Sequence, residues 1–257
     1  MGAQAQIRLF VEQVLEKGAK IALSPEQSHY LMNVMRAQAG REIFLFDGQS
    51  GEWRAKLLDA KKKNATAEII EISRPFKELA DITLAFAPIK RMHTDFIAQK
   101  ATELGARVLQ PVMTSRTVAE RVNTQRLRAH AIEAAEQCGL VSVPQINEPM
   151  ALDKYIASCE ARADKENLRL MFCDETGMAR PARAMLEEES NAKAIPWIIL
   201  VGPEGGFAEP ERERLQQLSF SRPVSLGPRI MRADTAAIAA LTLWQAYLGD
   251  FSEALAK

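Results

Sequence analysis

A glycine-rich turn is the first feature of the chain that could bind a ligand. It reads Gly202-Pro203-Glu204-Gly205-Gly206, follows the apolar, strand-like run 197–201 and precedes a helix with Pro210 in its first turn. Glycines in such a turn let a ligand approach the backbone, or they permit a positive φ. A phosphate would use free N–H groups at the helix start, but the Gly-Lys-Ser/Thr signature of a phosphate loop is absent here. The turn predicts a ligand site; the alternative is a tight chain reversal without a ligand.

Three glutamates narrow the chemistry of that ligand. Glu204, Glu209 and Glu211 crowd the start of the helix and would repel a di- or triphosphate. This disfavours an enzyme that uses a nucleoside triphosphate. A neutral or cationic ligand fits better, and S-adenosylmethionine, a sulfonium compound without phosphate, is such a ligand. Alternatively, the glutamates only stabilise the positive end of the helix dipole.

A second turn has the same setting between a strand and a helix. Residues 226–232 read Leu-Gly-Pro-Arg-Ile-Met-Arg and lead into a helix for which Asp234 or Thr235 is the expected N-cap. One interpretation is that the backbone, Ile230 and Met231 line a purine pocket while an arginine faces a substrate. The other is that both arginines lie at the surface without a ligand.

Basic residues form a third group. Lys100 lies on a predicted helix, and a run of cations follows the strand-like residues 108–112, with Glu120 as the one acid among them. The run comprises Arg116, Arg121, Arg126, Arg128 and His130. A face that contacts phosphate groups is one interpretation, and a solvated helix face is the commoner one.

The elements that must position these residues change character near residue 80. Before it, short extended runs separated by turns predict a small β-barrel with one helix over 25–36, and residues 73–78 are an expected linker. After it, strands alternate with helices, which predicts an α/β domain with a parallel sheet covered on both faces and ligand-binding loops at the carboxyl ends of its strands. We expect domains at 1–74 and 79–257. The expected strands are 7–11, 42–46, 53–58, 67–72, 82–87, 108–112, 169–173, 197–201 and 223–226. The expected turns include 47–51 and 61–64. The expected helices after residue 80 are 95–104, 123–138, 209–218 and 234–248.

Composition limits the class of protein. Of 257 residues, 47% are hydrophobic and 26% charged, and 33 basic residues balance 33 acidic ones. This mix is typical of a folded globular protein and argues against a disordered or coiled-coil chain. A non-specific nucleic-acid coat protein should be clearly basic, so that class is disfavoured, whereas a folded RNA can still be bound through a local basic face.

Cysteine, histidine and the apolar runs bear on metals and compartment. Three cysteines and three histidines have no spacing typical of a disulfide framework or a zinc site, so no metal is expected. Residues 1–6 lack the pattern of a signal peptide, and the longest apolar-rich run, 236–248, is shorter than the ~20 residues needed to span a bilayer. These features predict a cytoplasmic protein without a membrane partner.

Several separate motifs, in order along nearly the whole chain, resemble a known family. They are His29…Val34-Met35-Arg36, Phe46-Asp47-Gly48, Gln99-Lys100-Ala101-Thr102-Glu103-Leu104-Gly105, Pro111…Thr114…Arg116, Glu136-Gln137, and the two turns 202–206 and 226–232. The chain resembles the bacterial small-subunit (16S) ribosomal RNA methyltransferases that modify N3 of a uridine, in the SPOUT (trefoil-knot) superfamily. The resemblance implies a PUA-like RNA-binding β-barrel at 1–74, a knotted methyltransferase domain at 79–257, and a homodimer that acts on 16S ribosomal RNA or on the assembled 30S particle.

The resemblance also implies roles for individual residues. S-adenosylmethionine is expected to bind Leu200, Val201, Gly202, Pro203, Glu204, Gly205, Gly206, Leu226, Gly227, Ile230 and Met231. Arg232 is the expected catalytic residue, because a guanidinium would stabilise negative charge on the uracil oxygens as N3 loses its proton. Water or the Asp234 carboxylate would accept that proton, although Asp234 fits a helix cap better. RNA contacts are expected from Arg8, Arg36, Lys100 and Arg116.

The chain departs from the family pattern at four places. Leu140 stands where an arginine is usual, Asp234 where glutamate is common and Met231 where leucine is usual, and residues 92–95 replace a stretch of more Gly/Glu character. Two other functions stay open: a related methyltransferase that acts on another RNA site, and an RNA-binding protein without catalysis. The glycines retained in both turns favour an enzyme.

Overall fold

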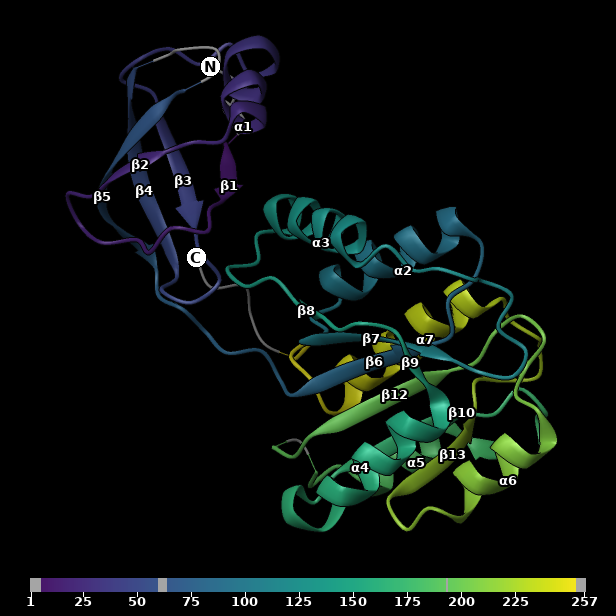
Figure 1. The fold of residues 1–257 in the computed structure, drawn as a ribbon. Helices are drawn as coiled ribbons and strands as arrows, with labels where there is room; N and C mark the ends of the chain where they lie inside the picture. The colour runs from purple at the N-terminus through teal and green to yellow at the C-terminus, as the bar shows by residue number, and fades with distance from the viewer. Residues whose placement is uncertain (1–5, 60–63, 193, 253–257) are drawn as a thin grey trace. The chain divides into compact units, whose positions relative to one another are not determined.

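The chain forms two compact units, shown as a ribbon in Figure 1, and the computed structural model describes residues 6–59, 64–192 and 194–252. Unit 1 comprises Met1–Glu78 and Ala135–Val143, and unit 2 comprises Leu79–Ala134 and Pro144–Lys257. Residues 135–143 thus join the N-terminal unit, which the sequence pattern does not predict. The expected turn at 61–64 falls almost wholly outside the described residues.

The sheet of unit 1 has five strands in the order β1-β3-β4-β5-β2. β1 pairs with β3 in parallel, and the other neighbours are antiparallel. The strands are β1 (Arg8–Phe10), β2 (Lys20–Ala22), β3 (Glu42–Phe46), β4 (Glu52–Asp59) and β5 (Thr66–Arg74). Four of them lie at the expected runs, and the three-residue β2 is not predicted. The expected turn between β3 and β4 is closed by Asp47 Oδ1, which accepts from the N–H groups of Gln49 and Ser50.

One helical segment covers a face of this sheet. The α-helix α1 (Pro25–His29) continues into a π-helical turn, η1 (Tyr30–Val34), where the sequence predicts a single helix. Ser24 begins it with a capping box, because its Oγ accepts from the Gln27 N–H while the Gln27 side chain accepts from the Ser24 N–H. Leu31 is fully buried and shares a core with Ile43 and Leu45, which alternate along β3.

Arg8 has a structural position in unit 1. Its side chain is 8% exposed and pairs with the buried carboxylate of Glu52, which Arg74 also contacts. The other donors of Arg8 bond the backbone oxygens of residues 135, 136 and 140, at the end of helix α3 (Thr124–Cys138), where the helix leaves carbonyl groups unpaired. The guanidinium of Arg8 is thus buried and engaged within unit 1, which argues against an RNA contact, and its RNA-binding role stays a prediction.

Unit 2 is built on one parallel sheet in the order β11-β13-β10-β12-β6-β7-β8, with β9 paired to β7 beside this path. The strands are β6 (Ile82–Phe86), β7 (Val108–Met113), β8 (Gln145–Ile146), β9 (Met150–Ala151), β10 (Arg169–Cys173), β11 (Arg180–Pro181), β12 (Trp197–Val201) and β13 (Ser221–Ser225). The predicted α/β class with a parallel sheet is confirmed. β12 lies between β10 and β6, so strands far apart in the chain are neighbours in the sheet.

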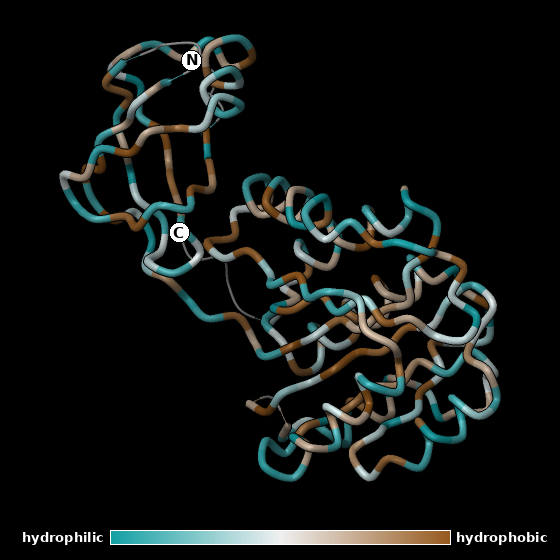
Figure 2. The backbone as a smooth tube through the Cα atoms, viewed as in Figure 1, coloured by the Kyte–Doolittle hydropathy of each residue, from teal (hydrophilic) through white to brown (hydrophobic). Residues whose placement is uncertain are grey.

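Helices cover both faces of this sheet (Figure 1). They are α2 (Arg91–Glu103), α3, α4 (Leu152–Glu166), α5 (Ala182–Glu188), α6 (Glu209–Gln217) and α7 (Ala233–Tyr247). Alternate residues of β12 face opposite layers: Trp197, Ile199 and Val201 join a core with α2, α5 and α7, whereas Ile198 and Leu200 join a core with α4 and α6. Figure 2 shows the corresponding hydrophobic stretches within the sheet.

Two helices and one cap differ from the expectations. The sequence interpretation assigns neither α4 nor α5. Lys90 is the N-cap of α2, and the Thr94 hydroxyl is buried and bonds the backbone just before the helix. Arg232, and not Asp234 or Thr235, is the N-cap of α7. Within residues 6–59, 64–192 and 194–252, no helix has the length and apolar character to cross a membrane.

Candidate functional site

Three adjacent strands of unit 2 end at one cavity. β13, β10 and β12 are neighbours and parallel, so the loops that follow them lie at the same edge of the sheet. A cavity of about 500 Å³ lies among these loops, lined by residues 173–177, 201–203 and 225–231 with Ala179, Pro181, Ala233 and Ala236. Its volume is in the range of roughly 300–1,000 Å³ that small organic ligands occupy. The two turns selected from the sequence therefore meet at one place.

The expected cofactor residues divide into two groups. Those that line this cavity are Val201, Gly202, Pro203, Leu226, Gly227, Ile230 and Met231. Leu200 is buried in the layer of α4 and α6 instead, Gly206 lies against Glu175, and Glu204 and Gly205 line a second cavity. The geometry thus reduces the set of expected cofactor residues that line the first cavity. The binding role of each residue stays a prediction.

Glycine is favoured at two positions of the turn after β12. A Cβ on Gly206, which has φ +68°, would lie 2.3 Å from Oε1 of Glu175. A Cβ on Gly202 would lie 2.6 Å from the ring of Phe207, which is fully buried and packs edge-on against Phe172 at 5.2 Å between ring centroids. Glu175 Oε1 also accepts from the Phe207 N–H at 3.0 Å. A buried ring and a carboxylate therefore hold this turn against the loop that follows β10.

The loop after β10 supplies an acidic wall that the sequence interpretation misses. Asp174 and Glu175 are the carboxylate residues that line the cavity, and Asp174 Oδ1 accepts from the Thr176 N–H at 3.0 Å. The signal is present in the sequence, because Asp174-Glu175-Thr176-Gly177 directly follows the strand predicted at 169–173. Its importance depends on the position of β10 between β12 and β13.

The three glutamates singled out in the sequence do not line this cavity. Glu211 is engaged at the start of α6, where its carboxylate accepts from the N–H groups of Ala208 and Ser115. Glu209 is exposed, and Glu204 lines the second cavity. Helix capping and the strand order direct these carboxylates away from this cavity, and the cofactor-binding role expected for Glu204 stays a prediction. The acidic residues of this wall are Asp174 and Glu175 instead, and Arg212 lies 4.0 Å from the first carboxylate and 3.5 Å from the second.

Arg232 lies beside the cavity. It is the N-cap of α7, between Met231 and Ala233, which both line the cavity. Its side chain is exposed and forms no hydrogen bond or ion pair with any residue that the structure describes. The guanidinium is therefore available to a second ligand next to the first.

Asp234 is held by a histidine. His93 Nδ1 lies 2.6 Å from Asp234 Oδ2, and Asp234 Oδ1 accepts from the Thr235 N–H at 2.7 Å. Although burial raises the pKa of Asp234, the hydrogen bonds from His93 and Thr235 hold it below its usual value, so the carboxylate is a weak base. This argues against Asp234 as the proton acceptor. The pair joins two of the places where the chain departs from the family pattern.

The other expected RNA contacts lie in different parts of the chain. Arg36, in unit 1, is exposed and has no partner among the described residues. Lys100, on α2, pairs with Glu103. Arg116 lines the second cavity and donates to the carbonyl oxygen of Gly205 at 2.9 Å. Their RNA-binding roles stay predictions. In the described part of the chain, no group of three or more His, Cys, Asp or Glu is placed to hold a metal ion.

Fold and site define an α/β protein with a cavity, in the loops at the carboxyl edge of a parallel sheet, of the size that small organic ligands occupy. Residues 77–245 match the RNA methyltransferase domain, and residues 23–70 match the RNA methyltransferase PUA domain. The chain belongs to the RNA methyltransferase family that the first of these models describes. The resemblance inferred from the motifs is confirmed.

Individual relatives agree with this family. The chain is 30% identical over 236 residues to the ribosomal RNA small subunit methyltransferase E of Rickettsia conorii, with 91% of this chain and 93% of that protein covered. It is 34% identical over 240 residues to the protein of the same name from Synechocystis sp., with 92% and 76% covered.

Solved structures are also similar. A putative methyltransferase from Legionella pneumophila in complex with the bound cofactor S-adenosylmethionine has a TM-score of 0.81 at 29% identity, with 94% of this chain and 98% of that chain covered. The ribosomal RNA small subunit methyltransferase E of Neisseria gonorrhoeae, bound to S-adenosylmethionine, has a TM-score of 0.77 at 27% identity, with 96% and 100% covered.

Proposed function

We propose that this protein transfers a methyl group from S-adenosylmethionine to N3 of a uridine in the 16S ribosomal RNA of the small subunit. The relatives are ribosomal RNA small subunit methyltransferases, and two similar structures contain S-adenosylmethionine. The observation that carries the proposal is the cavity at the ends of β13, β10 and β12, where both glycine-proline turns meet.

The residues of this cavity fit the cofactor. Leu226, Ile230 and Met231 offer apolar surface to an adenine ring, and the backbone of both turns offers donors and acceptors. The Glu175 carboxylate, with a side chain that is 36% exposed, suits the ribose hydroxyls or the positive charges of the ligand, whereas the Asp174 side chain is 1% exposed and is bonded within the wall. Burial raises the pKa of the Cys173 thiol to about 12, so this wall residue stays neutral and offers no competing nucleophile.

S-adenosylmethionine supplies an electrophilic methyl group on a sulfonium. The two turns bind and orient the ligand, which aligns its methyl group with the attacking nitrogen. Water accepts the N3 proton, and Arg232 stabilises the negative charge that spreads onto the uracil oxygens, because its unpaired guanidinium lies next to the cavity. A paired or stacked uridine must first leave its helix to reach this site.

The test of the mechanism is Arg232→Ala. We expect turnover on 16S ribosomal RNA to fall by about a hundredfold or more, the usual scale for a lost electrostatic donor, while the Kd for S-adenosylmethionine measured by calorimetry stays within about threefold. Lys154→Ala, at an exposed position on α4, is the control and should leave both values unchanged. Near-normal turnover of the Arg232 variant would remove this residue from the mechanism.

The proposal includes the assembly and compartment that the resemblance implies. We assign RNA binding to residues 1–74 and methyl transfer to a knotted SPOUT domain at 79–257, and we propose that the chain acts as a homodimer in the cytoplasm on small-subunit RNA or the 30S particle. The position of β12 between β10 and β6 means that the chain does not follow the order of the strands in the sheet of unit 2, and this supports the proposal of a knotted domain. Light scattering of the purified protein tests the dimer.

Two other functions make different predictions. An RNA-binding protein without catalysis would show no thermal stabilisation by S-adenosylmethionine, whereas a working site is stabilised in proportion to ligand occupancy. A methyltransferase for another RNA site would leave methylated uridines in small-subunit RNA unchanged when the gene is deleted. Mass mapping of that RNA with and without the gene distinguishes these cases.

A further inference from the structure

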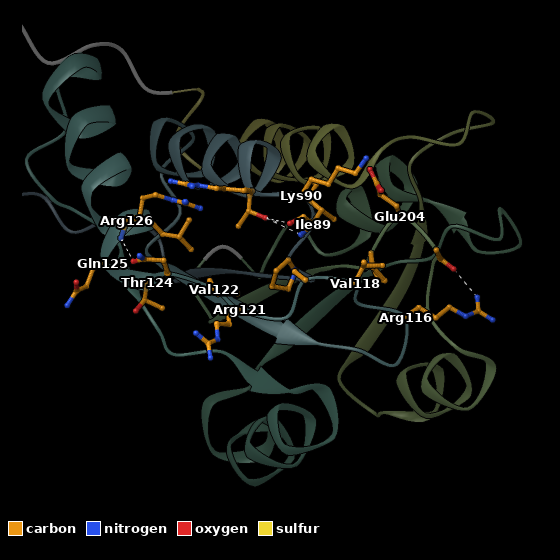
Figure 3. A pocket seen from close by; sticks show the side chains of 18 residues that line it. Ile89, Lys90, Arg116, Val118, Arg121, Val122, Thr124, Gln125, Arg126 and Glu204 are labelled. Atoms are coloured by element: carbon orange, nitrogen blue, oxygen red, sulfur yellow. Dashed lines mark hydrogen bonds between the residues drawn. The ribbon is translucent and has the colours of Figure 1, made fainter.

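A second cavity lies beside the cofactor cavity in unit 2 (Figure 3). Its volume is about 750 Å³, and it is lined by residues 88–91 with Thr94 around the start of α2, by most of residues 116–127, and by residues 203–205. Pro203 lines both cavities. The turn after β12 therefore forms part of the wall of each, and a ligand in the second cavity would lie next to the cofactor.

The second cavity is rich in positive charge. Its lining includes Lys90, Arg91, Arg116, Arg121 and Arg126, with Glu204 as the carboxylate residue among the lining side chains. Figure 3 shows the labelled cations Lys90, Arg116, Arg121 and Arg126 distributed around the cavity. Since the whole chain has 33 basic and 33 acidic residues, this excess is local. It favours an anionic ligand.

Three of these cations are free to bind such a ligand. Arg126 pairs with Asp95 at 2.9 Å, and Arg116 donates to a backbone oxygen, so both have a structural role. Lys90, Arg91 and Arg121 are exposed and form no hydrogen bond or ion pair with any residue in the described ranges. Exposed cations without a partner are common on protein surfaces, so the observation that favours a ligand is that all three line one cavity.

The cavity also offers apolar surface. Ile89, Val118 and Val122 contribute to its lining, and the side chain of Val118 is 90% exposed. A bare inorganic anion would leave this surface in water, whereas a nucleotide has both an organic body for the apolar wall and phosphate groups for the cations. None of the lining residues is aromatic, so stacking of a base on an aromatic ring does not contribute to recognition. Recognition through phosphate groups is independent of base identity.

We propose that this cavity binds the nucleotide next to the target uridine in the RNA strand, with Lys90, Arg91 and Arg121 at its phosphate groups. The inference rests on the proposed function, because the shared Pro203 places the cavity beside the methyl donor. The cavity fixes the strand while the neighbouring base enters the methyl-transfer site. Base identity at the bound position has little effect on the reaction.

The test compares two double variants. Arg91→Ala/Arg121→Ala removes two free cations from the cavity, and Lys154→Ala/Lys165→Ala removes two exposed cations of α4 that have no partner among the described residues. Binding of a 16S ribosomal RNA transcript is measured across salt concentrations, together with kcat and KM for methylation and the Kd for S-adenosylmethionine.

For the cavity variant, we expect the slope of log affinity against log salt to become shallower by about 1.4, since each single-strand phosphate contact contributes about 0.7. KM for RNA should rise at least about tenfold, the scale of a lost phosphate-binding pair, while kcat and the Kd for S-adenosylmethionine change less than about threefold. The α4 variant should leave all four quantities unchanged.

Three results overturn the inference. The first is an unchanged salt slope in the cavity variant, and the second is an equal change in the α4 variant, which would reduce the effect to net charge. The third is a difference in oligomeric state, measured by sedimentation, between the cavity variant and the unsubstituted protein. Such a difference would mean that a second copy of the chain occupies the cavity. Failure of the unsubstituted protein to bind S-adenosylmethionine or to methylate 16S RNA refutes the proposed function itself, and this result is seen before any substitution is made.

Discussion

The adjacent glycines 205 and 206 offer a sharp test of the cofactor site. Gly206 has φ +68°, and a Cβ at this position would come within 2.3 Å of Oε1 and 2.8 Å of Cδ of Glu175. Gly205 has no such restriction, because its added Cβ would meet only the Arg116 side chain at 3.7 Å. Gly206→Ala should therefore disturb the turn, and Gly205→Ala should not.

The expected magnitude has two parts. An L residue in the left-handed region costs about 1 kcal/mol. Displacing Glu175 breaks its hydrogen bond with the Phe207 N–H, and a bond to a charged group contributes about 1.5 kcal/mol at the lower end, which suits a side chain that is 36% exposed. We expect the turn of the unbound variant to relax away from the strained conformation, so that ligand binding must restore it. The total of about 2.5 kcal/mol is then lost from the free energy of binding, which corresponds to roughly 60-fold in Kd.

Isothermal calorimetry with S-adenosylmethionine measures this effect. We expect the Kd of Gly206→Ala to rise by roughly 60-fold and that of Gly205→Ala to stay within about twofold. Equal affinities of the two variants would refute the reasoning, since it depends on the contact between Gly206 and Glu175. Circular dichroism of both variants confirms that unit 2 is folded.

Three further predictions concern stability. Burial raises the pKa of Glu52, but the hydrogen bonds and charges of Arg74 and Arg8 hold it below its ordinary value of 4.5. The stability that this group contributes is therefore present above pH 4.5 and is lost as the pH falls through the lower pKa of the folded state. Glu52→Gln should destabilise unit 1 by about 3 kcal/mol in urea at neutral pH and reduce its acid sensitivity; an unchanged midpoint would contradict the buried ion pair. Phe207→Ala should lower the free energy of unfolding by about 3–5 kcal/mol, with Phe207→Leu as the milder control, and equal losses would argue against the buried ring contact. Asp234→Asn should destabilise the protein at neutral pH and not at acid pH, because the unsubstituted protein also loses the pairing as the pH falls through the lowered pKa of Asp234; chemical unfolding at several pH values checks this.

Local pattern predicts most of the individual elements. β3, β10 and β12 have the bounds that their apolar runs predict, and the glycine turns after β12 and β13 lie where the sequence places them. The apolar residues of α4 are spaced as in a helix, at Leu152, Tyr155, Ile156, Cys159 and Ala163, so that helix could have been predicted as well. Such features depend on neighbours in the chain and can be deduced from the sequence alone.

Caps and charged residues are harder to predict. Thr94 has the right residue type for an N-cap, yet its hydroxyl bonds the backbone of Ile89 and Lys90 takes the cap position. Arg8 has the type of an RNA contact, yet Glu52, which is 44 residues away, binds it within unit 1. In both cases a competing partner decides the role, and the sequence pattern does not show which partner is close.

The sequence by itself determined that this chain has an N-terminal β-rich part, an α/β part and two glycine-proline turns that follow strands, because glycine, proline and alternating apolar residues act locally. The tertiary structure decided that β10 lies between β12 and β13, which brings Asp174 and Glu175 to the cofactor cavity. It also decided that His93 meets Asp234 across 141 residues. The physical reason is that cavities and ion pairs are formed by side chains distant in sequence, whose proximity depends on the order of strands in the sheet.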